Sequence, residues 1–306
     1  EIRSFVPEII HVHNLFPNWS TSWVGEVSHP IVTTLHNYRA ICANGLMYRD
    51  GAQCDLCLER GHSLPALSHG CYRDSKLATL PWAVSHVRLS QSDVLVRQSS
   101  ALIALNEQAK ETLSRSGVDA RRIELIPNSV SASARARTES TQRNRWLVAG
   151  RLTPEKGIAD LCNTWVSDER LDVFGDGPEA DVIGSLGRSN IVFHGSIPRS
   201  DLLRRMGSYT GLFIPSRWAE MLPTIAIEAL SQGVPLIARS GTAVSQLVIS
   251  FGVGRTYTKP SEISRAMDEV RYNRESLSSE CIRVFQSHFS DDIWISRIES
   301  LYKRLV

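Results

Sequence analysis

The sequence predicts an α/β protein with two domains, each built on a parallel sheet, and three observations lead to this prediction. Short runs rich in Val, Ile and Leu recur along the chain, and helical patterns lie between most of them. Such alternation is typical of parallel sheets. Residues 129–144 are polar and lack apolar periodicity, so they divide the chain into two parts. With 306 residues, of which 42% are hydrophobic, the chain is long enough for two domains.

The expected elements follow one another in a regular order. Strands are expected at residues 8–13, 30–36, 101–105, 123–126, 146–150, 171–174, 191–194, 211–214 and 234–238. Helices are expected at residues 107–116, 154–166, 178–186, 199–206, 224–231, 242–249 and about 290–305. This order predicts a first domain at residues 1–130, a linker at 131–144, a second domain at 145–288, and a C-terminal helix at 289–306 that packs back on the first domain.

Composition and charge exclude several classes of protein. A net charge of +2 provides no broad basic field for nucleic acid. No apolar run approaches the roughly 20 residues of a membrane span, and no signal peptide opens the chain. Six cysteines in a chain of this length favour a reducing compartment, so we expect a cytoplasmic protein. The chain begins at Glu1 directly before a strand, so we expect the natural start to be missing and the first domain to be incomplete.

Two glycine-containing loops of the second domain carry the features of a phosphate site. Arg151 and Lys156 follow the strand at 146–150, with Gly150 and Gly157 beside them. Two cations near a helix start can flank a pyrophosphate, although a solvated Arg and Lys is the alternative interpretation. The segment FGDGPE, which contains Gly175 and Gly177, follows the next strand.

Two glutamates follow a later strand of the same domain. Glu228 lies on a helix that begins near Pro223 and Thr224, where a carboxylate can accept hydrogen bonds from ribose hydroxyls. Glu220 lies in the preceding loop, and its carboxylate is expected to face a sugar and its phosphates. The alternative is a pair of surface glutamates. We favour the functional reading because apolar neighbours surround Glu228, and a buried carboxylate is costly without a partner.

Together these motifs resemble the retaining glycosyltransferases of the GT-B fold in family 4. The marks of that family are an R-x4-K-G loop, a G-D-G-P turn and an E-x7-E motif. They stand here as Arg151, Lys156 and Gly157, as residues 175–178, and as Glu220 and Glu228. The resemblance implies two Rossmann-like domains that face a cleft. One departure is Met221, which stands where the family usually has glycine, and its bulk is expected to narrow the sugar pocket or displace the loop.

The N-terminal half resembles the acceptor-side domain of the same family, through HVHN at residues 11–14 and TLHNYR, which ends at Arg39. The resemblance implies that His36 faces the donor sugar and phosphate, so His36 and Glu220 are the expected catalytic residues. The expected donor-binding residues are Gly150, Arg151, Lys156, Gly175, Gly177, Pro223, Thr224 and Glu228. The expected cleft residues are His13, Asn14, Asn37 and Arg39.

The absence of any D-x-D motif argues against a catalytic divalent metal, so Arg151, Lys156 and helix N-termini are expected to neutralise the diphosphate. A separate group of cysteines, Cys42, Cys54, Cys57 and Cys71, lies in a loop-like segment at residues 42–71 and contains a C-x-x-C pair. Four thiolates suit a structural zinc ion. Free or redox-active thiols, disulfides and an iron–sulfur cluster are the alternatives.

The resemblance implies transfer of a sugar from a nucleoside-diphosphate sugar to an acceptor hydroxyl with retention, in the synthesis of a polysaccharide, glycolipid or lipid-linked glycan. The expected partners are a nucleotide sugar and a carbohydrate or lipid-linked acceptor. A helix expected at about 75–96 either covers the core or rests on the inner face of a membrane. A non-catalytic GT-B module that binds a nucleotide sugar or a partner protein is the alternative, and a nucleotide-sugar epimerase is a lesser one.

Overall fold

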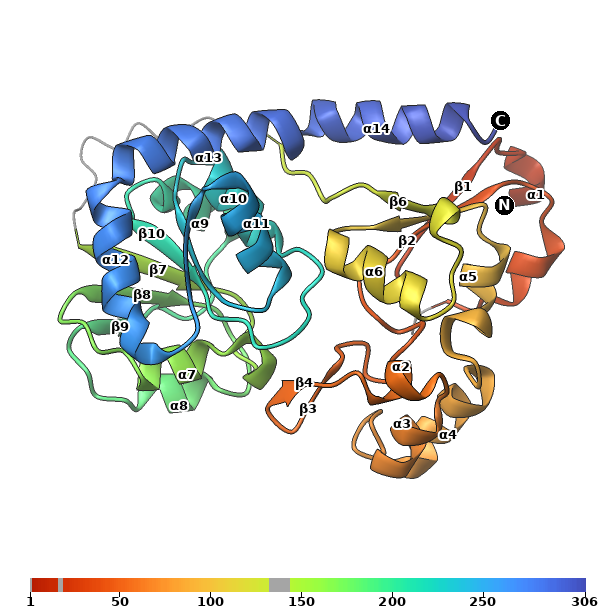
Figure 1. Cartoon of the computed structure of the whole chain (residues 1–306), viewed down its shortest axis with the longest axis horizontal. Coiled ribbons are helices and arrows are strands. Elements are labelled where there is room, and N and C mark those ends of the chain that lie inside the picture. Colours follow the sequence, from red (N-terminus) through yellow and green to blue (C-terminus); the bar gives the residue numbers. More distant parts are fainter. Residues whose placement is uncertain (1, 16–18, 132–143) are drawn as a thin grey trace. The chain divides into compact units, whose positions relative to one another are not determined.

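The computed structural model describes residues 2–15, 19–131 and 144–306 (Figure 1). Most of the expected linker at 131–144 therefore lies outside the described residues. The chain divides into two compact units, which are described here one at a time. The first unit comprises Glu1–Pro127 and Trp294–Val306, and the second comprises Asn128–Ile293.

The second unit is built on a six-stranded parallel sheet. Its strands are β7 (Arg145–Ala149), β8 (Arg170–Phe174), β9 (Ile191–Phe193), β10 (Gly211–Ile214), β11 (Leu236–Arg239) and β12 (Gly254–Tyr257). Their order across the sheet is β12-β11-β10-β7-β8-β9. The chain thus runs outward from β7 to β9 and then returns with β10 to the other side of β7. Open parallel sheets bind ligands at such a reversal, beyond the carboxyl ends of the strands.

Helices connect these strands in the right order for a doubly wound sheet. The connections contain η4 (Pro154–Lys156), α7 (Ile158–Asn163), α8 (Ala180–Gly184), α9 (Arg199–Met206), α10 (Thr224–Ser231) and α11 (Ala243–Phe251). After the last strand, β12, come η5 (Pro260–Glu262), α12 (Ile263–Tyr272), α13 (Arg274–His288) and the start of α14 (Asp291–Lys303). A parallel strand pair requires such crossover connections because the chain must return to the same edge of the sheet.

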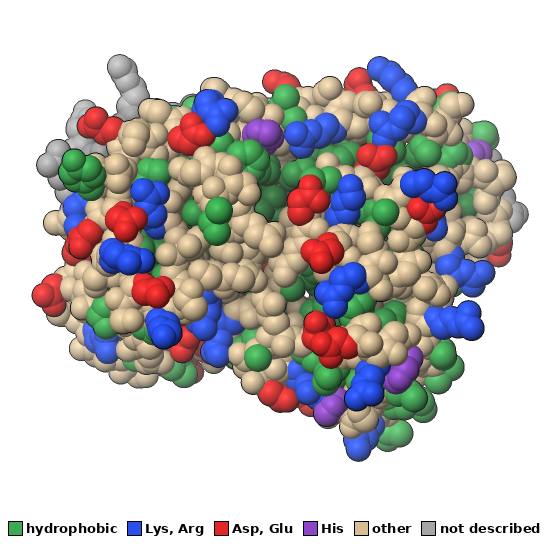
Figure 2. All heavy atoms as spheres, in the orientation of Figure 1, with side chains coloured by type: hydrophobic (Ala, Val, Ile, Leu, Met, Phe, Trp, Pro, Cys, Tyr) green, Lys and Arg blue, Asp and Glu red, His purple; other side chains and the backbone are tan. Residues whose placement is uncertain are grey.

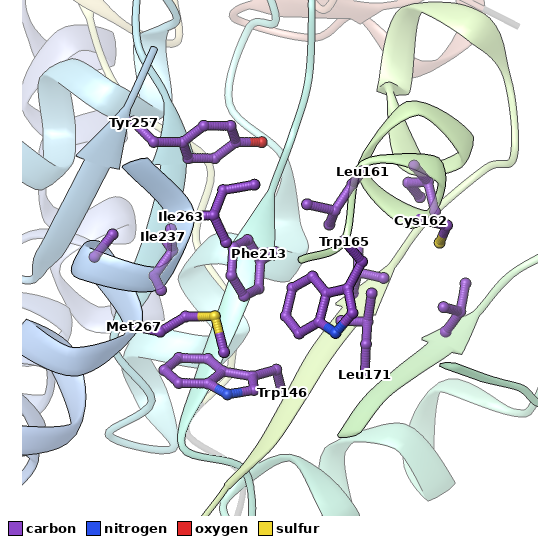
Figure 3. Close-up of a cluster of buried hydrophobic side chains, with 14 of the residues drawn as sticks. Trp146, Leu161, Cys162, Trp165, Leu171, Phe213, Ile237, Tyr257, Ile263 and Met267 are labelled. Carbon is purple, nitrogen blue, oxygen red and sulfur yellow. The ribbon is translucent and has the colours of Figure 1, made fainter. Parts of the chain in front are cut away.

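The core of the second unit is rich in aromatic side chains (Figure 3). Phe213 of β10 makes edge-to-face contacts with Trp146 of β7 and Trp165, with ring centroids 5.6 and 5.2 Å apart. These side chains are almost fully buried, and burial of large aromatic rings contributes strongly to stability. Because Trp146 and Phe213 lie on neighbouring strands, their packing holds together β7 and β10, the two strands at the reversal of the sheet.

The first unit contains a four-stranded parallel sheet in the order β1-β2-β5-β6. Its strands are β1 (Ile10–His13), β2 (Ile31–Thr34), β5 (Ala101–Ala104) and β6 (Ile123–Leu125). Helical elements of this unit include α1 (Ile2–Phe5), η1 (Ser22–Glu26), α5 (Val94–Gln98), α6 (Glu107–Arg115) and η3 (Ala120–Arg122). The C-terminal segment belongs here, since Tyr302 contacts His11 at 2.6 Å and Arg304 pairs with Glu124 at 2.5 Å.

A long excursion separates β2 from β5 and carries the four clustered cysteines. Before α5 it contains a short hairpin and four helical elements: β3 (Tyr48–Arg49), β4 (Ala52–Gln53), α2 (Leu56–Arg60), α3 (Leu64–His69), α4 (Lys76–Ser85) and η2 (Leu89–Gln91). None of the helices in the described parts of the chain is both long enough and apolar enough to cross a membrane.

The prediction of parallel-sheet domains is confirmed, and every expected strand is present within one or two residues of its expected bounds. Two expected helices are wrong in detail. The helix expected at 154–166 is a 3-10 turn and then α7, because Gly157 at φ +66° interrupts it. The helix expected at 75–96 ends at Ser85, and Asp93 caps a separate helix, α5, by accepting from the N–H of Val96.

Candidate active site

The loops that follow β7 and β10 meet at the reversal point of the second sheet. Lys156 comes from the β7 loop and Glu220 from the β10 loop, and the ammonium of Lys156 pairs directly with Oε1 of Glu220. The Lys156 ammonium also lies 5.7 Å from the centre of the Trp218 ring, within reach of a cation–π interaction. A cation and a carboxylate thus stand side by side where the fold places a ligand.

Glu220 is a buried carboxylate with both oxygens engaged. Its side chain is about 5% exposed, and its Oε2 accepts a 2.7 Å hydrogen bond from the hydroxyl of Ser216. Burial of an ionised carboxylate is costly unless partners compensate it, and Lys156 and Ser216 supply that compensation. Lys156, Ser216 and Glu220 line a cavity of about 240 Å³ of empty space, open to solvent, together with Pro223 and Ile225.

Arg151 has a different environment from Lys156. Its side chain is 67% exposed, and its guanidinium lies 3.8 Å from the carboxylate of Glu155, four residues later. An exposed pair of this kind contributes little to stability, so Arg151 can exchange this partner for another anion at small cost. The structure therefore places the two predicted cations on one loop, one held by Glu220 and one directed toward solvent.

Glycines allow the loops of this site to approach one another closely. A Cβ atom added at Gly157 would lie 2.5 Å from the carbonyl oxygen of Pro215 in the β10 loop. At Gly175 an added Cβ would lie 1.9 Å from the oxygen of Gly150, and at Gly177 it would lie 2.5 Å from the oxygen of Leu152. Only glycine fits such contacts between backbones. The sequence predicts these glycines as donor-site residues. In the structure they allow the backbones of neighbouring loops to come close together.

Glu228 lies on α10, 4% exposed, and pairs with a residue that the sequence analysis did not single out. The Nε of Arg199 donates to Oε1 of Glu228 at 2.5 Å. Arg199 is the first residue of α9, where a cation is unfavourable to the helix dipole. An arginine at the start of a predicted helix is the signal in the sequence that could have identified Arg199. Helix α10 itself begins at Thr224, after Pro223, without a side-chain capping bond.

In the first unit, three histidines meet near the carboxyl ends of β1 and β2. His13 Nδ1 lies 2.9 Å from Nε2 of His36, so one ring donates and the other accepts. The ring of His11 lies 4.3 Å from that of His13, and its two nitrogens contact the hydroxyls of Tyr302 and Thr34 at 2.6 and 2.7 Å. The parallel register that pairs His13 with Thr34 brings this group together.

Burial keeps this group of histidines neutral near pH 7. It lowers the pKa of His11 to about 4, with smaller contributions from His13 and His36. Burial also lowers the pKa values of His13 and His36, and the nearby His13 lowers that of His36 further. A neutral His36 that shares one N–H with His13 keeps its other ring nitrogen for another partner.

The remaining expected cleft residues divide into two groups. Asn37 Nδ2 donates to Oδ1 of Asn14 at 3.2 Å, so these two side chains accompany the pair of histidines. Arg39 instead turns into the excursion, where its guanidinium donates to the carbonyl of Ala43 at 2.8 Å and lies 5.4 Å from the ring of Tyr72. The structure thus does not bring the Arg39 guanidinium to the histidines.

All four clustered cysteines line one cavity in the first unit. In the part of the chain that the structure describes, no group of three or more His, Cys, Asp or Glu side chains is arranged to hold a metal ion. The expected zinc site therefore stays a prediction.

Comparisons with known proteins agree with the two-unit arrangement. Residues 131–282 match the family model "Glycosyl transferases group 1", and residues 1–134 match "Glycosyltransferase Family 4". Among solved structures, the chain is similar to HepE of Anabaena in complex with UDP, at 16% identity and a TM-score of 0.67, covering 99% of this chain and 79% of that chain. It has the GT-B fold. Another GT-B neighbour is sucrose-phosphate synthase of Thermosynechococcus elongatus, at 17% identity and a TM-score of 0.69, covering 99% of this chain and 75% of that chain.

Two curated proteins match this chain over only part of their own length. An exopolysaccharide phosphotransferase of Streptomyces coelicolor is 24% identical over 222 residues, which cover 67% of this chain and 23% of that protein. An uncharacterized 41.2 kDa protein in the cps region of Klebsiella pneumoniae is 22% identical over 227 residues, which cover 69% of this chain and 63% of that protein. The GT-B chain therefore spans less than two thirds of either relative. Both matched family models describe glycosyltransferases.

Proposed function

We propose that this GT-B chain transfers a hexose from a nucleoside-diphosphate sugar to an acceptor hydroxyl with retention of anomeric configuration. The observation that carries the proposal is the contact between Lys156 and Glu220 at the reversal point of the second sheet. A partly buried cation beside a buried carboxylate can serve a ligand that has both phosphate and hydroxyl groups. A UDP-sugar is the first donor to test, because HepE was crystallised with UDP and with UDP-glucose.

In this proposal, different residues of the second unit bind the diphosphate, the ribose and the sugar of the donor. Arg151 and Lys156 neutralise the diphosphate, and the uncapped backbone N–H groups at the start of α10 add further donors. Glu228 accepts hydrogen bonds from the ribose hydroxyls. Glu220 holds the sugar, and its pairing with Lys156 links the sugar site to the phosphate site.

Catalysis rests on positioning and on charge stabilisation. His36 holds a sugar hydroxyl or the departing phosphate, and His13 fixes the orientation of its ring through their 2.9 Å contact. The acceptor attacks from the face that the diphosphate leaves, and the leaving phosphate helps to take the acceptor proton. Preorganised donors around the diphosphate lower the barrier because they stabilise the charge that develops on it.

No divalent cation is needed for the transfer in this proposal, since no D-x-D motif occurs and paired cations stand in the β7 loop. Activity that survives brief chelation with EDTA supports this assignment. Loss of activity that Mn²⁺ restores would contradict it.

The acceptor is proposed to be a lipid-linked or membrane-associated glycan on the cytoplasmic side. Helix α4 presents Leu77, Leu80 and Val84, which are 84%, 43% and 65% exposed. Leu64 and Val87 extend this apolar surface, which Figure 2 shows at the lower right. Co-sedimentation with phosphatidylethanolamine–phosphatidylglycerol vesicles tests this contact. Leu77→Ser with Val84→Ser should release the protein, whereas Val182→Ser in the second unit should not.

The central experiment offers UDP-glucose and GDP-mannose to the purified chain, with water as acceptor. Release of UDP or GDP is measured, and proton NMR identifies the anomer that first appears. An α-sugar from an α-linked donor supports retaining transfer, and a β-sugar contradicts retention. Binding without turnover would favour a non-catalytic GT-B module. Isomerised nucleotide sugar would favour an epimerase.

A further inference from the structure

The excursion between β2 and β5 gathers four cysteine side chains around one cavity of the first unit. Cys42 follows β2, Cys54 and Cys57 flank the start of α2, and Cys71 follows α3. All four side chains are partly buried. The first and last cysteines are 29 positions apart in the sequence, yet the fold brings all four to the same cavity.

The electrostatics of these cysteines show that they form one group. Each of the six possible pairs of thiols interacts through its charges. Burial raises the pKa values of the Cys42, Cys57 and Cys71 thiols, to about 12 for Cys57 and about 11 for Cys71, and nearby backbone N–H groups offset only part of this effect at Cys42 and Cys57. In keeping with a protonated thiol, the Sγ of Cys42 donates to Oδ1 of Asn44 at 3.0 Å. A metal bound here would therefore have to displace the thiol protons.

Two arginines supply charge compensation at the same place. Arg39 interacts with Cys42, and Arg49 interacts with Cys71. Zinc bound by four thiolates carries a net charge of −2, which two neighbouring cations offset, although Arg49 also pairs with the exposed Asp50 at 3.4 Å.

We propose that Cys42, Cys54, Cys57 and Cys71 bind one zinc ion that cross-links the excursion between β2 and β5. The four thiols release their protons to solvent as four Zn–S bonds form. Because no three ligand side chains stand in a coordinating arrangement within the described residues, binding requires the cysteine side chains to turn toward the centre of their cavity.

The excursion has the features of a segment that depends on such a cross-link. Four residues close to the cysteines, Met47, Asp50, Arg73 and Asp74, have left-handed backbones with φ between 50° and 56°. Strained residues of this kind persist where their surroundings hold them. The N–H of Cys42 donates to the carbonyl of Tyr38 at 2.8 Å, so an anchored Cys42 also holds the turn that begins at His36.

Metal analysis of protein purified under reducing conditions without added chelator tests the proposal. We expect about one zinc ion per chain, as one closed tetrahedral site requires. Cys57→Ser should lose the zinc, whereas Cys281→Ala, at a buried cysteine of the second unit, should retain it. UDP affinity should stay unchanged in both variants, so this test is independent of the proposed transfer activity.

A second measurement covers the case in which Cys57→Ser fails to fold. Wild-type protein with zinc exchanged for Co²⁺ should show the intense visible bands of a tetrahedral cobalt–thiolate site. Weak octahedral bands would overturn the proposal, as would two disulfides found by thiol titration and mass spectrometry. Stoichiometric iron with acid-labile sulfide would overturn it in favour of an iron–sulfur cluster.

Discussion

Arg199 donates from Nε to Oε1 of Glu228 at 2.5 Å, so the carboxylate expected to hold a ribose already has a cationic partner. The two residues come from different helices, and their exposure is unequal. Glu228 is 5% exposed in its side chain, whereas Arg199 is 64% exposed. The guanidinium therefore reaches from solvent to a buried anion and fixes one of its oxygens, which leaves the other oxygen for a ligand.

The first prediction concerns this pair. Arg199→Ala should lower the free energy of unfolding by about 1–3 kcal/mol, because it leaves a buried carboxylate with one partner fewer. The same change should weaken UDP binding, since the orientation of Glu228 is lost. Chemical denaturation and calorimetric titration measure the two effects. Arg204→Ala on the same helix removes only an exposed pair with Asp201, so it should change stability by less than about 0.5 kcal/mol. Equal behaviour of the two variants would contradict the role of Arg199.

The second prediction concerns the cations of the β7 loop. Arg151→Ala should weaken UDP binding by about 1.5–3 kcal/mol, as expected for loss of one charge-assisted contact. Stability should hardly change, because Arg151 is 67% exposed. Arg265→Ala, which removes a similarly exposed arginine of α12, serves as the control. Unchanged affinity in Arg151→Ala would remove this residue from the donor site.

The third prediction separates the two glutamates. Glu228→Gln should chiefly reduce UDP affinity, because its proposed partner is the ribose. Glu220→Gln should reduce kcat more than UDP affinity, because its proposed partner is the sugar, which UDP lacks. Titration with UDP and initial rates with the full donor distinguish the two. If both variants lost UDP affinity equally, the division of roles would be wrong.

The fourth prediction is a pH dependence of stability in the first unit. Burial lowers the pKa of His11 to about 4 in the folded chain, whereas an unfolded histidine titrates near 6.5. Between these values the unfolded state binds more protons, so stability rises with pH and falls on acidification from about 6.5 toward 4. After a discount for solvent screening, we expect about 1–2 kcal/mol from this residue across that window.

Denaturation at pH 7.5 and pH 5 measures this effect. His11→Gln should flatten the pH dependence, because glutamine keeps polar contacts but does not titrate. His69→Gln replaces an exposed histidine and should leave the dependence as it is. A pH profile that is identical in all three proteins would show that His11 does not control it.

The sequence predicts the sheets, and it predicts that the loops after their strands lie together, because parallel strands all end at one edge. Lys156 and Glu220 are 64 residues apart, yet each follows a strand, and the two strands turn out to be neighbours. Helix α12 was missed although Ile263, Ala266, Met267 and Val270 are buried at helical spacing. The spacing of these apolar residues indicates a helix. The edge strand β12, in contrast, has only four residues, and its buried and exposed positions do not alternate regularly.

Other features depend on side-chain direction, which spacing along the chain does not give. Arg39 follows His36 by three residues, but its guanidinium is held by the carbonyl of Ala43 in the excursion. Met221 was expected to narrow the sugar pocket or displace the loop, and its side chain is buried, at 4% exposed. Which of the two it does stays a prediction. The contact between Arg199 and Glu228 joins two helices whose mutual orientation follows from the packed sheet and not from either segment alone.

The backbone contacts at Gly157, Gly175 and Gly177 have a consequence for protein engineering. Each of these glycines touches the main chain of a neighbouring loop, so the loops after β7, β8 and β10 form a single interlocked block. A chimaera that imports one of these loops from a relative with another donor preference would bring a backbone path unmatched to the other two. Donor preference should therefore be exchangeable only by grafting all three loops as a set, and single-loop grafts should yield misfolded or inactive protein.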